Sequence, residues 1–308
     1  MLNKIKRINI ELTNKCNLRC TMCDIWKEGP KSDISPEIMT KIFESKYLDN
    51  NVDITFTGGE LFLNEKLIDL TEILLEKRSN SLKTISTNGY FTKMIDDYLK
   101  KFSISLPEDF SLHISLDGIN IHDQQRGKKS LHNILETINL VKEKYPRISI
   151  KIKFTITPLN YKDIMPTYEF CKKNNLDFRV KLVEYAENYT NKVDKKTFDF
   201  GENTKKLIAK DLLQIYKEKL TTDKQNAQFI KNTIYFLLNK SNSLSHEEEY
   251  DRIFIMSNGD VYSCIHIEKI GNLHINSLDE IWNSERAKSI ISLANKCNKC
   301  LVSYHGLV

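Results

Sequence analysis

Strand-like and helix-like segments alternate six times between residues 6 and 183, and this alternation restricts the fold more than any other feature. The strand-like segments are residues 6–12, 52–56, 82–86, 110–116, 148–157 and 178–183. Segments with helical spacing of apolar residues follow them at 36–47, 67–77, 92–102, 131–144 and 160–174. Repeated β-α units build a parallel sheet with helices on its outer face. Six units are too few for a closed eight-stranded barrel. The pattern therefore predicts an α/β fold, an open partial (β/α)₆ barrel.

Three cysteines follow the first predicted strand: Cys16, Cys20 and Cys23, spaced C-x₃-C-x₂-C. Three thiolates this close can hold three corners of a 4Fe–4S cubane and leave one iron open to a ligand that is not protein. A structural zinc site is the alternative, although it usually takes four ligands in two pairs. A disulfide framework is not favoured, because the chain has only 7 cysteines in 308 residues and no secretory leader.

The segment CNLRCTMC, residues 16–23, resembles the signature of the radical SAM (S-adenosylmethionine) enzymes, including a hydrophobic residue, Met22, before the last cysteine. The resemblance implies that the open iron binds the amino and carboxylate groups of SAM, and that Met22 lies at the cofactor. It also implies that the reduced cluster cleaves SAM to methionine and a deoxyadenosyl radical, which takes a hydrogen atom from the substrate. The partial barrel is the fold of that family's core.

Gly58-Gly59-Glu60 follows the second predicted strand and resembles the GGE motif of the same family. Two glycines permit close backbone approach. In the family, the carboxylate of Glu60 would accept hydrogen bonds from the ammonium of SAM. Leu61 stands where the family usually has proline. Taken alone, the motif is also typical of an ordinary glycine-rich turn.

Polar residues end the next three predicted strands, as expected at the edge where such barrels build active sites. The resemblance implies that they contact SAM or substrate: Ser86, Asn88, Ser115, Asp117 and Thr157. Asp117 and Ser115 would bind the ribose hydroxyls, and the segment with Thr157 would pass the adenine. Plain turn chemistry is the alternative for Asp117 and Asn88. Arg126, in the segment HDQQRG, is a candidate for gripping a carboxylate of SAM or substrate, with a surface salt bridge as the alternative.

A second cysteine set lies near the C-terminus, in a G-x₄-C ending at Cys264 and a C-x₂-C at Cys297 and Cys300. It resembles a Twitch domain, the shortened SPASM domain, and so implies an auxiliary 4Fe–4S cluster. The usual first cysteine is absent. The fourth position is then an open iron that binds substrate, or a histidine such as His246, His266 or His305, or the site holds zinc through three sulfurs and one nitrogen. His266 is also a candidate catalytic residue, whereas Cys171 is expected to be a buried apolar residue.

These features predict three parts: a radical SAM partial barrel at 1–185, a helical insertion at 186–246, and a small α+β Twitch/SPASM-like domain at 247–308. The insertion is expected to hold helices at 207–220 and 225–239. The last part is expected to hold a hairpin at 253–263 and a helix at 278–293.

The predicted function is that of a radical SAM enzyme that modifies a ribosomally made peptide. The alternatives are oxidation or rearrangement of a small molecule such as a sugar or cyclitol and, in another class, a zinc-dependent binding module without catalysis. A flavodoxin or ferredoxin is the expected electron donor, and free cysteines predict a reducing cytoplasm. The sequence contains no run of about 18 apolar residues, so no membrane span is predicted. The net charge of +5 does not favour nucleic-acid binding.

Overall fold

The computed structural model describes residues 2–27, 29–186, 198–238 and 251–295. Within them, the strands form one sheet in the order β6-β5-β4-β3-β2-β1-β7-β8-β9. The first six strands pair in parallel with their neighbours, which confirms the predicted α/β fold. Their bounds are β1 (Ile5–Thr13), β2 (Leu48–Gly58), β3 (Leu82–Thr87), β4 (Ser111–Ser115), β5 (Ser149–Ile156) and β6 (Asp177–Leu182).

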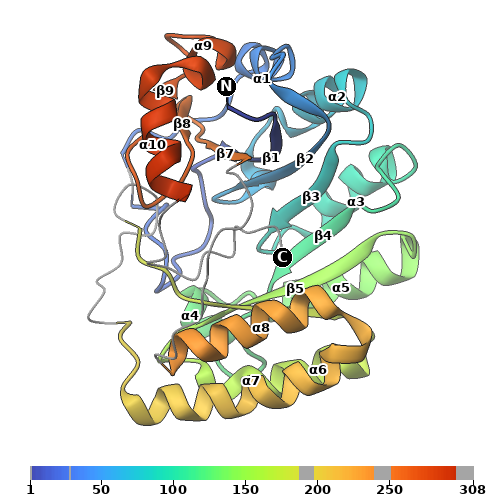
Figure 1. The fold of residues 1–308 in the computed structure, drawn as a ribbon. Helices are drawn as coiled ribbons and strands as arrows, with labels where there is room; N and C mark the ends of the chain where they lie inside the picture. Colours follow the sequence, from blue (N-terminus) through green and yellow to red (C-terminus); the bar gives the residue numbers. More distant parts are fainter. Residues whose placement is uncertain (1, 28, 187–197, 239–250, 296–308) are drawn as a thin grey trace.

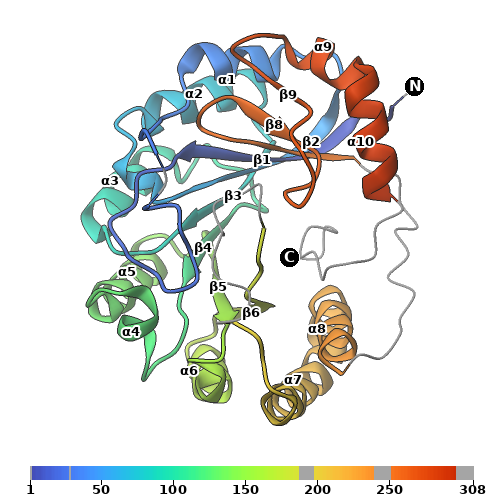
Figure 2. The same cartoon turned by 90° about the vertical axis from the view of Figure 1, so that its left-hand side faces the viewer.

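Helices cover the outer face of this curved sheet (Figure 1, Figure 2). They are α1 (Pro36–Phe43), α2 (Leu67–Lys77), α3 (Thr92–Phe102), α5 (Leu131–Lys144) and α6 (Ile164–Lys173). Their apolar stripes bury against alternate strand residues such as Ile54 and Ile152, which are fully buried. The opposite face of the sheet, here called the inner face, carries the polar alternate residues. The inner face and the carboxyl ends of the strands are therefore the surfaces available for binding and catalysis.

Helices α7 (Glu202–Thr222) and α8 (Lys224–Leu237) follow β6, and they contain most of the two predicted helical segments. Asp223 lies between them and accepts a hydrogen bond from the backbone N–H of Asn226, which caps α8. The Asn226 side chain donates to the carbonyl of Phe178 in β6. This contact docks the helix pair on the edge strand of the parallel sheet.

The C-terminal segment extends the same sheet. β7 (Arg252–Ile255) pairs in parallel with β1, and β8 (Asp260–Tyr262) and β9 (Gly271–Asn272) continue it in antiparallel order. This confirms the predicted hairpin. The single helix predicted at 278–293 is wrong, because α9 (Leu278–Asn283) and α10 (Glu285–Asn295) are separated at Ser284. Ser284 is extended, and its hydroxyl accepts from the Ala287 N–H, so its side chain starts a new helix.

Three short elements were not expected: η1 (Leu61–Leu63), α4 (His122–Arg126) and η2 (Tyr161–Asp163). The segment 160–174 begins at Asn160, but the Asn160 side chain does not cap the helix. Its amide donates to the carbonyls of Asp117 and Thr155 instead. Asn160 therefore ties the ends of β4 and β5 together.

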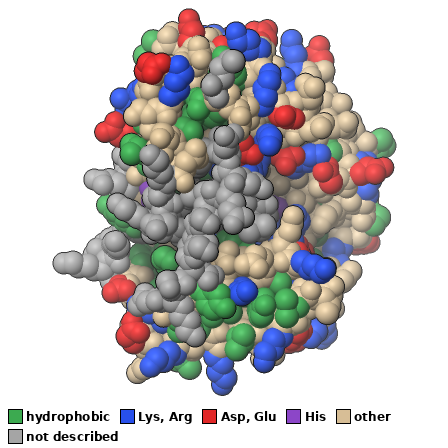
Figure 3. Space-filling view, viewed as in Figure 1, with side chains coloured by type: hydrophobic (Ala, Val, Ile, Leu, Met, Phe, Trp, Pro, Cys, Tyr) green, Lys and Arg blue, Asp and Glu red, His purple; other side chains and the backbone are tan. Residues whose placement is uncertain are grey.

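On the face seen in Figure 3, basic and acidic side chains are interspersed rather than gathered by sign. None of the described helices is both long and apolar enough to cross a membrane.

Candidate active site at the carboxyl ends of the strands

The loop after β1 carries the three N-terminal cysteines, and the glycine pair after β2 holds its first part. The Gly59 N–H donates to the Thr13 carbonyl and the Glu60 N–H to the Lys15 carbonyl, both at 2.8 Å. A Cβ on Gly59 would lie 2.1 Å from the Lys15 oxygen, and Gly58 has φ +145°. Only glycine permits this approach, so the GG pair fixes the chain directly before Cys16.

The second part of the cysteine loop is held by α4. The N–H of Arg19 donates to the Arg126 carbonyl at 3.1 Å, and the N–H of Thr21 to the Gln125 carbonyl at 2.9 Å. Gly127 ends α4 at φ +68°, and a Cβ there would lie 2.4 Å from the Arg19 oxygen. The loop is therefore clamped from two directions by backbone contacts.

The three thiols lie together inside this clamp, packed with Leu18 and Met22. Burial raises the pKa of Cys16 to about 11 and that of Cys23 to about 12, and it also raises the pKa of Cys20. Each thiol interacts electrostatically with at least one of the others. Metal loading must therefore displace their protons.

Arg126 places a cation beside the cysteine loop. Its Nε lies 2.6 Å from Oδ2 of Asp117, which is fully buried, and its Nη1 lies 3.7 Å from Sγ of Cys20. Asp117 also accepts a hydrogen bond from the Thr155 N–H at 2.7 Å. Burial raises the pKa of Asp117, against the attraction of Arg126. Arg126 therefore forms a buried ion pair, and the alternative of a surface salt bridge is wrong.

Glu60 is fully buried and links the ends of β2 and β3. Oε1 accepts from the Thr87 hydroxyl at 2.7 Å, and Oε2 accepts from the Asn88 N–H at 2.7 Å. Burial raises the pKa of Glu60 to about 7, against these hydrogen bonds. The Asn88 amide donates to Oδ1 of Asn17 at 2.8 Å, so β3 also reaches the cysteine loop.

The remaining predicted contacts are placed as follows. The hydroxyl of Thr157 is buried and donates to Oε1 of Gln125 at 2.7 Å, which turns it away from solvent. Ser86 and Ser115 lie on the inner face with intermediate exposure. Sequence reasoning missed Asn17 and Gln125. Asn17 could have been found, because it lies inside the cysteine signature.

In the C-terminal set, Cys264 is buried just after β8. His266 follows it with a buried Nε2 that has no hydrogen-bond partner among the described residues, and burial lowers its pKa. Cys297, Cys300, His246 and His305 lie outside the described residues. The fourth ligand of the C-terminal site thus stays a prediction.

A family model described as the Radical SAM superfamily matches residues 10–171, more than half of the chain. The chain belongs to the radical SAM superfamily. A second model, an iron–sulfur cluster-binding domain of the SPASM type, matches residues 247–301. This radical SAM chain is therefore an enzyme that uses a 4Fe–4S cluster and SAM, with a SPASM domain that indicates auxiliary iron–sulfur binding. The alternative of a zinc module without catalysis is wrong.

The known relatives differ in their activities. The chain is 23% identical over 238 residues to a probable GTP 3',8-cyclase of Methanocaldococcus jannaschii, covering 74% of this chain and 76% of the cyclase. It is 28% identical over 165 residues to the sporulation killing factor maturation protein SkfB of Bacillus subtilis, covering 53% of this chain and 38% of SkfB. The chain covers only 57 to 63% of the length of several other curated relatives.

Among solved structures, native anSMEcpe with bound AdoMet and Cp18Cys peptide resembles this fold with a TM-score of 0.70 at 19% identity. The match covers 95% of this chain and 84% of that one. At this identity the likeness establishes the radical SAM fold.

The N-terminal site of this radical SAM enzyme fits a cubane. Among the described residues, no three or more His, Cys, Asp or Glu side chains are placed to hold a single metal ion. The thiolates of a cubane bind different irons and need not converge on one point. Two buried donors of the same loop, Nδ2 of Asn17 and Nε1 of Trp26, have no partner among the described residues. Donors of this kind suit an added anionic group.

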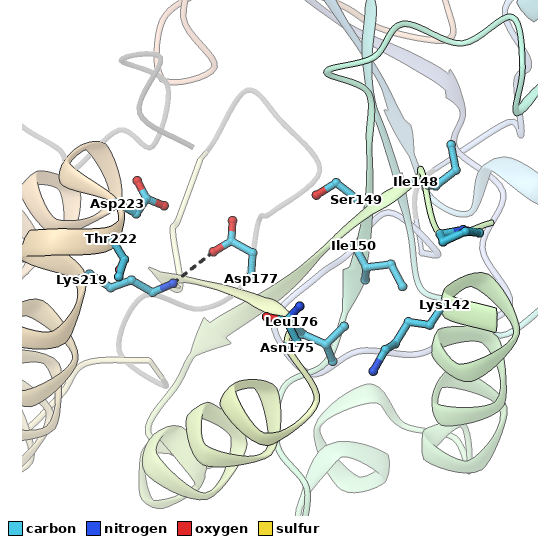
Figure 4. Close-up of a pocket in the computed structure, with 11 residues that line it drawn as sticks. Lys142, Ile148, Ser149, Ile150, Asn175, Leu176, Asp177, Lys219, Thr222 and Asp223 are labelled. Atoms are coloured by element: carbon cyan, nitrogen blue, oxygen red, sulfur yellow. Dashed lines mark hydrogen bonds and ion pairs between the residues drawn. The ribbon is translucent and has the colours of Figure 1, made fainter. Parts of the chain in front are cut away.

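A pocket of ≈ 540 Å³ lies at the opposite edge of the sheet, at the amino ends of β5 and β6 (Figure 4). Lys142, Asp177, Lys219 and Asp223 contribute its charges, and Lys219 pairs with Asp177 at 3.4 Å. It is remote from the cysteine loop, which lies at the carboxyl ends of the strands.

Proposed function

We propose that this enzyme modifies a peptide by abstracting a hydrogen atom from it at the carboxyl ends of the strands. The observation that carries the proposal is the pairing of the clamped cysteine loop with a SPASM-type domain in one chain. The name of SkfB, a maturation protein, and the peptide bound to anSMEcpe support a peptide substrate.

Cys16, Cys20 and Cys23 would hold the first cluster, which together with SAM supplies one-electron cleavage and hydrogen-atom abstraction. Arg126 lies against the Cys20 sulfur and favours its thiolate form. Asp117 holds Arg126 in place through the buried ion pair.

Other residues of the site would contact SAM. Gly58, Gly59 and Glu60 position the loop next to it, and Asn88 fixes Asn17, whose free amide hydrogens are available to a ligand. Ser86 and Ser115 are proposed contacts from the inner face. Asp117 and Thr157 support the site through their buried hydrogen bonds.

We divide the chain as predicted, into a partial barrel at 1–185, a helical insertion at 186–246 and a SPASM-like part at 247–308. Cys264, Cys297 and Cys300 would hold the auxiliary cluster. His266 is the described candidate for its fourth ligand, since its Nε2 lacks a partner among the described residues. A flavodoxin or ferredoxin in the cytoplasm would supply the electron.

The test is anaerobic reconstitution followed by incubation with SAM, dithionite and a short peptide encoded beside the gene. Deoxyadenosine together with a mass change in the peptide supports the proposal. Iron should approach about eight per chain with both clusters, and about four would remove the auxiliary one. Deoxyadenosine without any peptide product would contradict peptide modification.

A small-molecule reaction is the second candidate, because the alignment with the probable GTP 3',8-cyclase spans 74% of this chain, more than that with SkfB. The same incubation with GTP in place of peptide separates the two. Consumption of GTP that depends on Cys20 would favour this candidate.

A further inference from the structure

The inner face of β5 and β6 carries a row of cations. The rings of Phe154 in β5 and Phe178 in β6 meet edge to face with centroids 5.7 Å apart, and Phe178 lies 5.7 Å from the ring of Tyr168 in α6, so these residues face the helices. Side chains alternate along a strand, and the intervening residues therefore face inward. Those that are basic form what we call the inner cationic row: Lys151, Lys153, Arg179 and Lys181.

The members of this row differ in their partners. Arg179 pairs with Asp177 at 2.7 Å and with Asp223 at 2.6 Å, and Lys181 lies 3.8 Å from Glu184. Lys153 hydrogen-bonds or ion-pairs with no side chain among the described residues. It is the central member, in register with Ser115 on one side and Arg179 on the other.

The surroundings of Lys153 oppose its charge. Its pKa is lowered well below the ordinary lysine value, first by burial and then by repulsion from Arg179, Lys181 and Lys151. Asp177, a described residue that attracts this ammonium, is already held by Arg179. A partly buried ammonium among like charges has much to gain from an added anion.

Lys153 lies directly beside the candidate SAM site. Its carbonyl accepts from the Leu116 N–H at 3.0 Å, and Thr155, two residues further on, donates its N–H to Asp117. Two residues of a strand span roughly 6.6 Å. Asp117 in turn pairs with Arg126, which touches the Cys20 sulfur. An anion bound to Lys153 would therefore lie two strand residues from the contact between Thr155 and Asp117, next to the candidate SAM site.

We propose that Lys153 binds a carboxylate of the substrate peptide, so that the peptide carries an aspartate, a glutamate or a free carboxyl terminus close to the residue that reacts. This inference rests on the proposed peptide modification. Lys151 and Lys181 flank Lys153 in the row and add to its attraction, while Ser115 lies beside it in register. The row thereby selects against peptides that are basic at this position.

The test measures acetylation of Lys153 by an amine-reactive ester in the anaerobic, SAM-loaded enzyme, read by peptide mass spectrometry. Three probes are added separately: a tripeptide Gly-Glu-Gly blocked at both ends, its Gly-Gln-Gly counterpart, and inorganic phosphate. Lys93, exposed on α3, reports on the reagent itself. Labelling is followed across a pH series, because a bound carboxylate raises the pKa of Lys153 and the pH of half-maximal labelling should move upward with it.

The outcomes separate this inference from the proposed function. Slower labelling of Lys153 with the Glu peptide but not with the Gln peptide supports the inference. Equal protection by both peptides overturns carboxylate recognition while peptide binding stands. Protection by phosphate alone overturns a peptide carboxylate as the occupant and counts against the peptide function. No protection by any probe overturns the anion site and leaves the proposed function to its own test.

A pair of variants gives a second readout once a substrate peptide is known. Lys153→Met should raise the KM for the peptide at least about tenfold, the loss of one charge-assisted hydrogen bond, and Lys153→Arg should restore most of it. Iron content and SAM binding show that both variants fold. An unchanged KM in a well-folded Lys153→Met enzyme would overturn the inference.

Discussion

The two halves of the parallel sheet build the same edge by different means. On the β1–β3 side, backbone meets backbone: the glycine pair lies against Thr13 and Lys15, and Glu60 is enclosed by three hydrogen-bond donors. On the β5–β6 side, the inner face presents cations, and Lys153 has no partner among the described residues. One half is held by backbone contacts, and the other presents charged side chains.

This difference matches the demands on a radical SAM enzyme. The cluster would stay bound to the cysteine loop through every turnover, and rigid backbone contacts suit such a resident group. A substrate must enter and leave, and unpaired charge on an inner wall provides attraction without closing the site. Substitutions should therefore be destabilising in the first half and tolerated by the fold in the second.

The largest effect is expected for Cys20→Ala. It removes one of three cluster ligands and the sulfur that Arg126 contacts. Deoxyadenosine formation from SAM should fall below detection, with a loss of about four irons per chain. Cys171→Ala is the control, because Cys171 is buried in the core on α6. If Cys20→Ala still cleaved SAM, the cysteine loop would have no part in the reaction.

Next is Arg126→Met, which leaves Asp117 buried without its cation. Breaking a buried pair costs about 3–5 kcal/mol of unfolding free energy, measured by urea unfolding of the metal-free protein. Lys129→Met, three residues away and exposed, should stay within about 0.5 kcal/mol. Adding Asp117→Asn to Arg126→Met should recover part of the loss. If Arg126→Met alone were as stable as the parent, the ion pair between Arg126 and Asp117 would not be needed to hold α4.

Gly59→Ala should cost roughly 3 kcal/mol or more, because its Cβ would meet backbone that cannot give way. The same shift would displace Cys16, whose Cβ lies 3.1 Å from the new methyl, so iron incorporation should fall as well. Gly29→Ala is the matched control, since nothing lies within 4 Å of its Cβ position. Equal stabilities of the two variants would contradict the close approach.

The backbone contacts that hold the cysteine loop could not be predicted from the sequence. The strands, the hairpin and the order of the motifs follow from local patterns, because periodicity and turn residues act over a few positions. The helix break at Ser284 was missed, because a serine inside a helical pattern is equally able to cap a new helix.

The pairing of Arg126 with Asp117 was missed for another reason. It joins α4 to the end of β4, and nothing in the residues themselves says which ion pair will be buried. The inner cationic row was available in the sequence, since the alternation Ile-Lys-Ile-Lys in β5 places its lysines on one face. The position of this row beside the candidate cluster site could be seen only in the structure.

A smaller effect is expected from pH acting on Glu60. Burial raises the pKa of this carboxyl to about 7, against 4.5 for an ordinary glutamate. Its contribution to stability is complete below pH 4.5 and is lost as the pH rises through about 7, a change of about 3 kcal/mol. Glu60→Gln should flatten this slope in urea unfolding of the metal-free protein. An unchanged slope would assign the pH dependence to other groups.

The smallest effect, and the one with opposite sign, is expected for Lys153→Met. The folded protein disfavours the charge of Lys153, because burial and three neighbouring cations oppose it. Methionine has similar length and no charge, so the metal-free variant should be more stable than the parent by about 0.5–2 kcal/mol, seen as a higher midpoint in urea. Lys93→Met, exposed on α3, should change little. A clear loss of stability in Lys153→Met would mean that Lys153 is a structural group, and the contrast between the two halves of the sheet would fail. A gain would show a stability cost at a position that the fold does not need, which is the signature of a residue kept for its ligand.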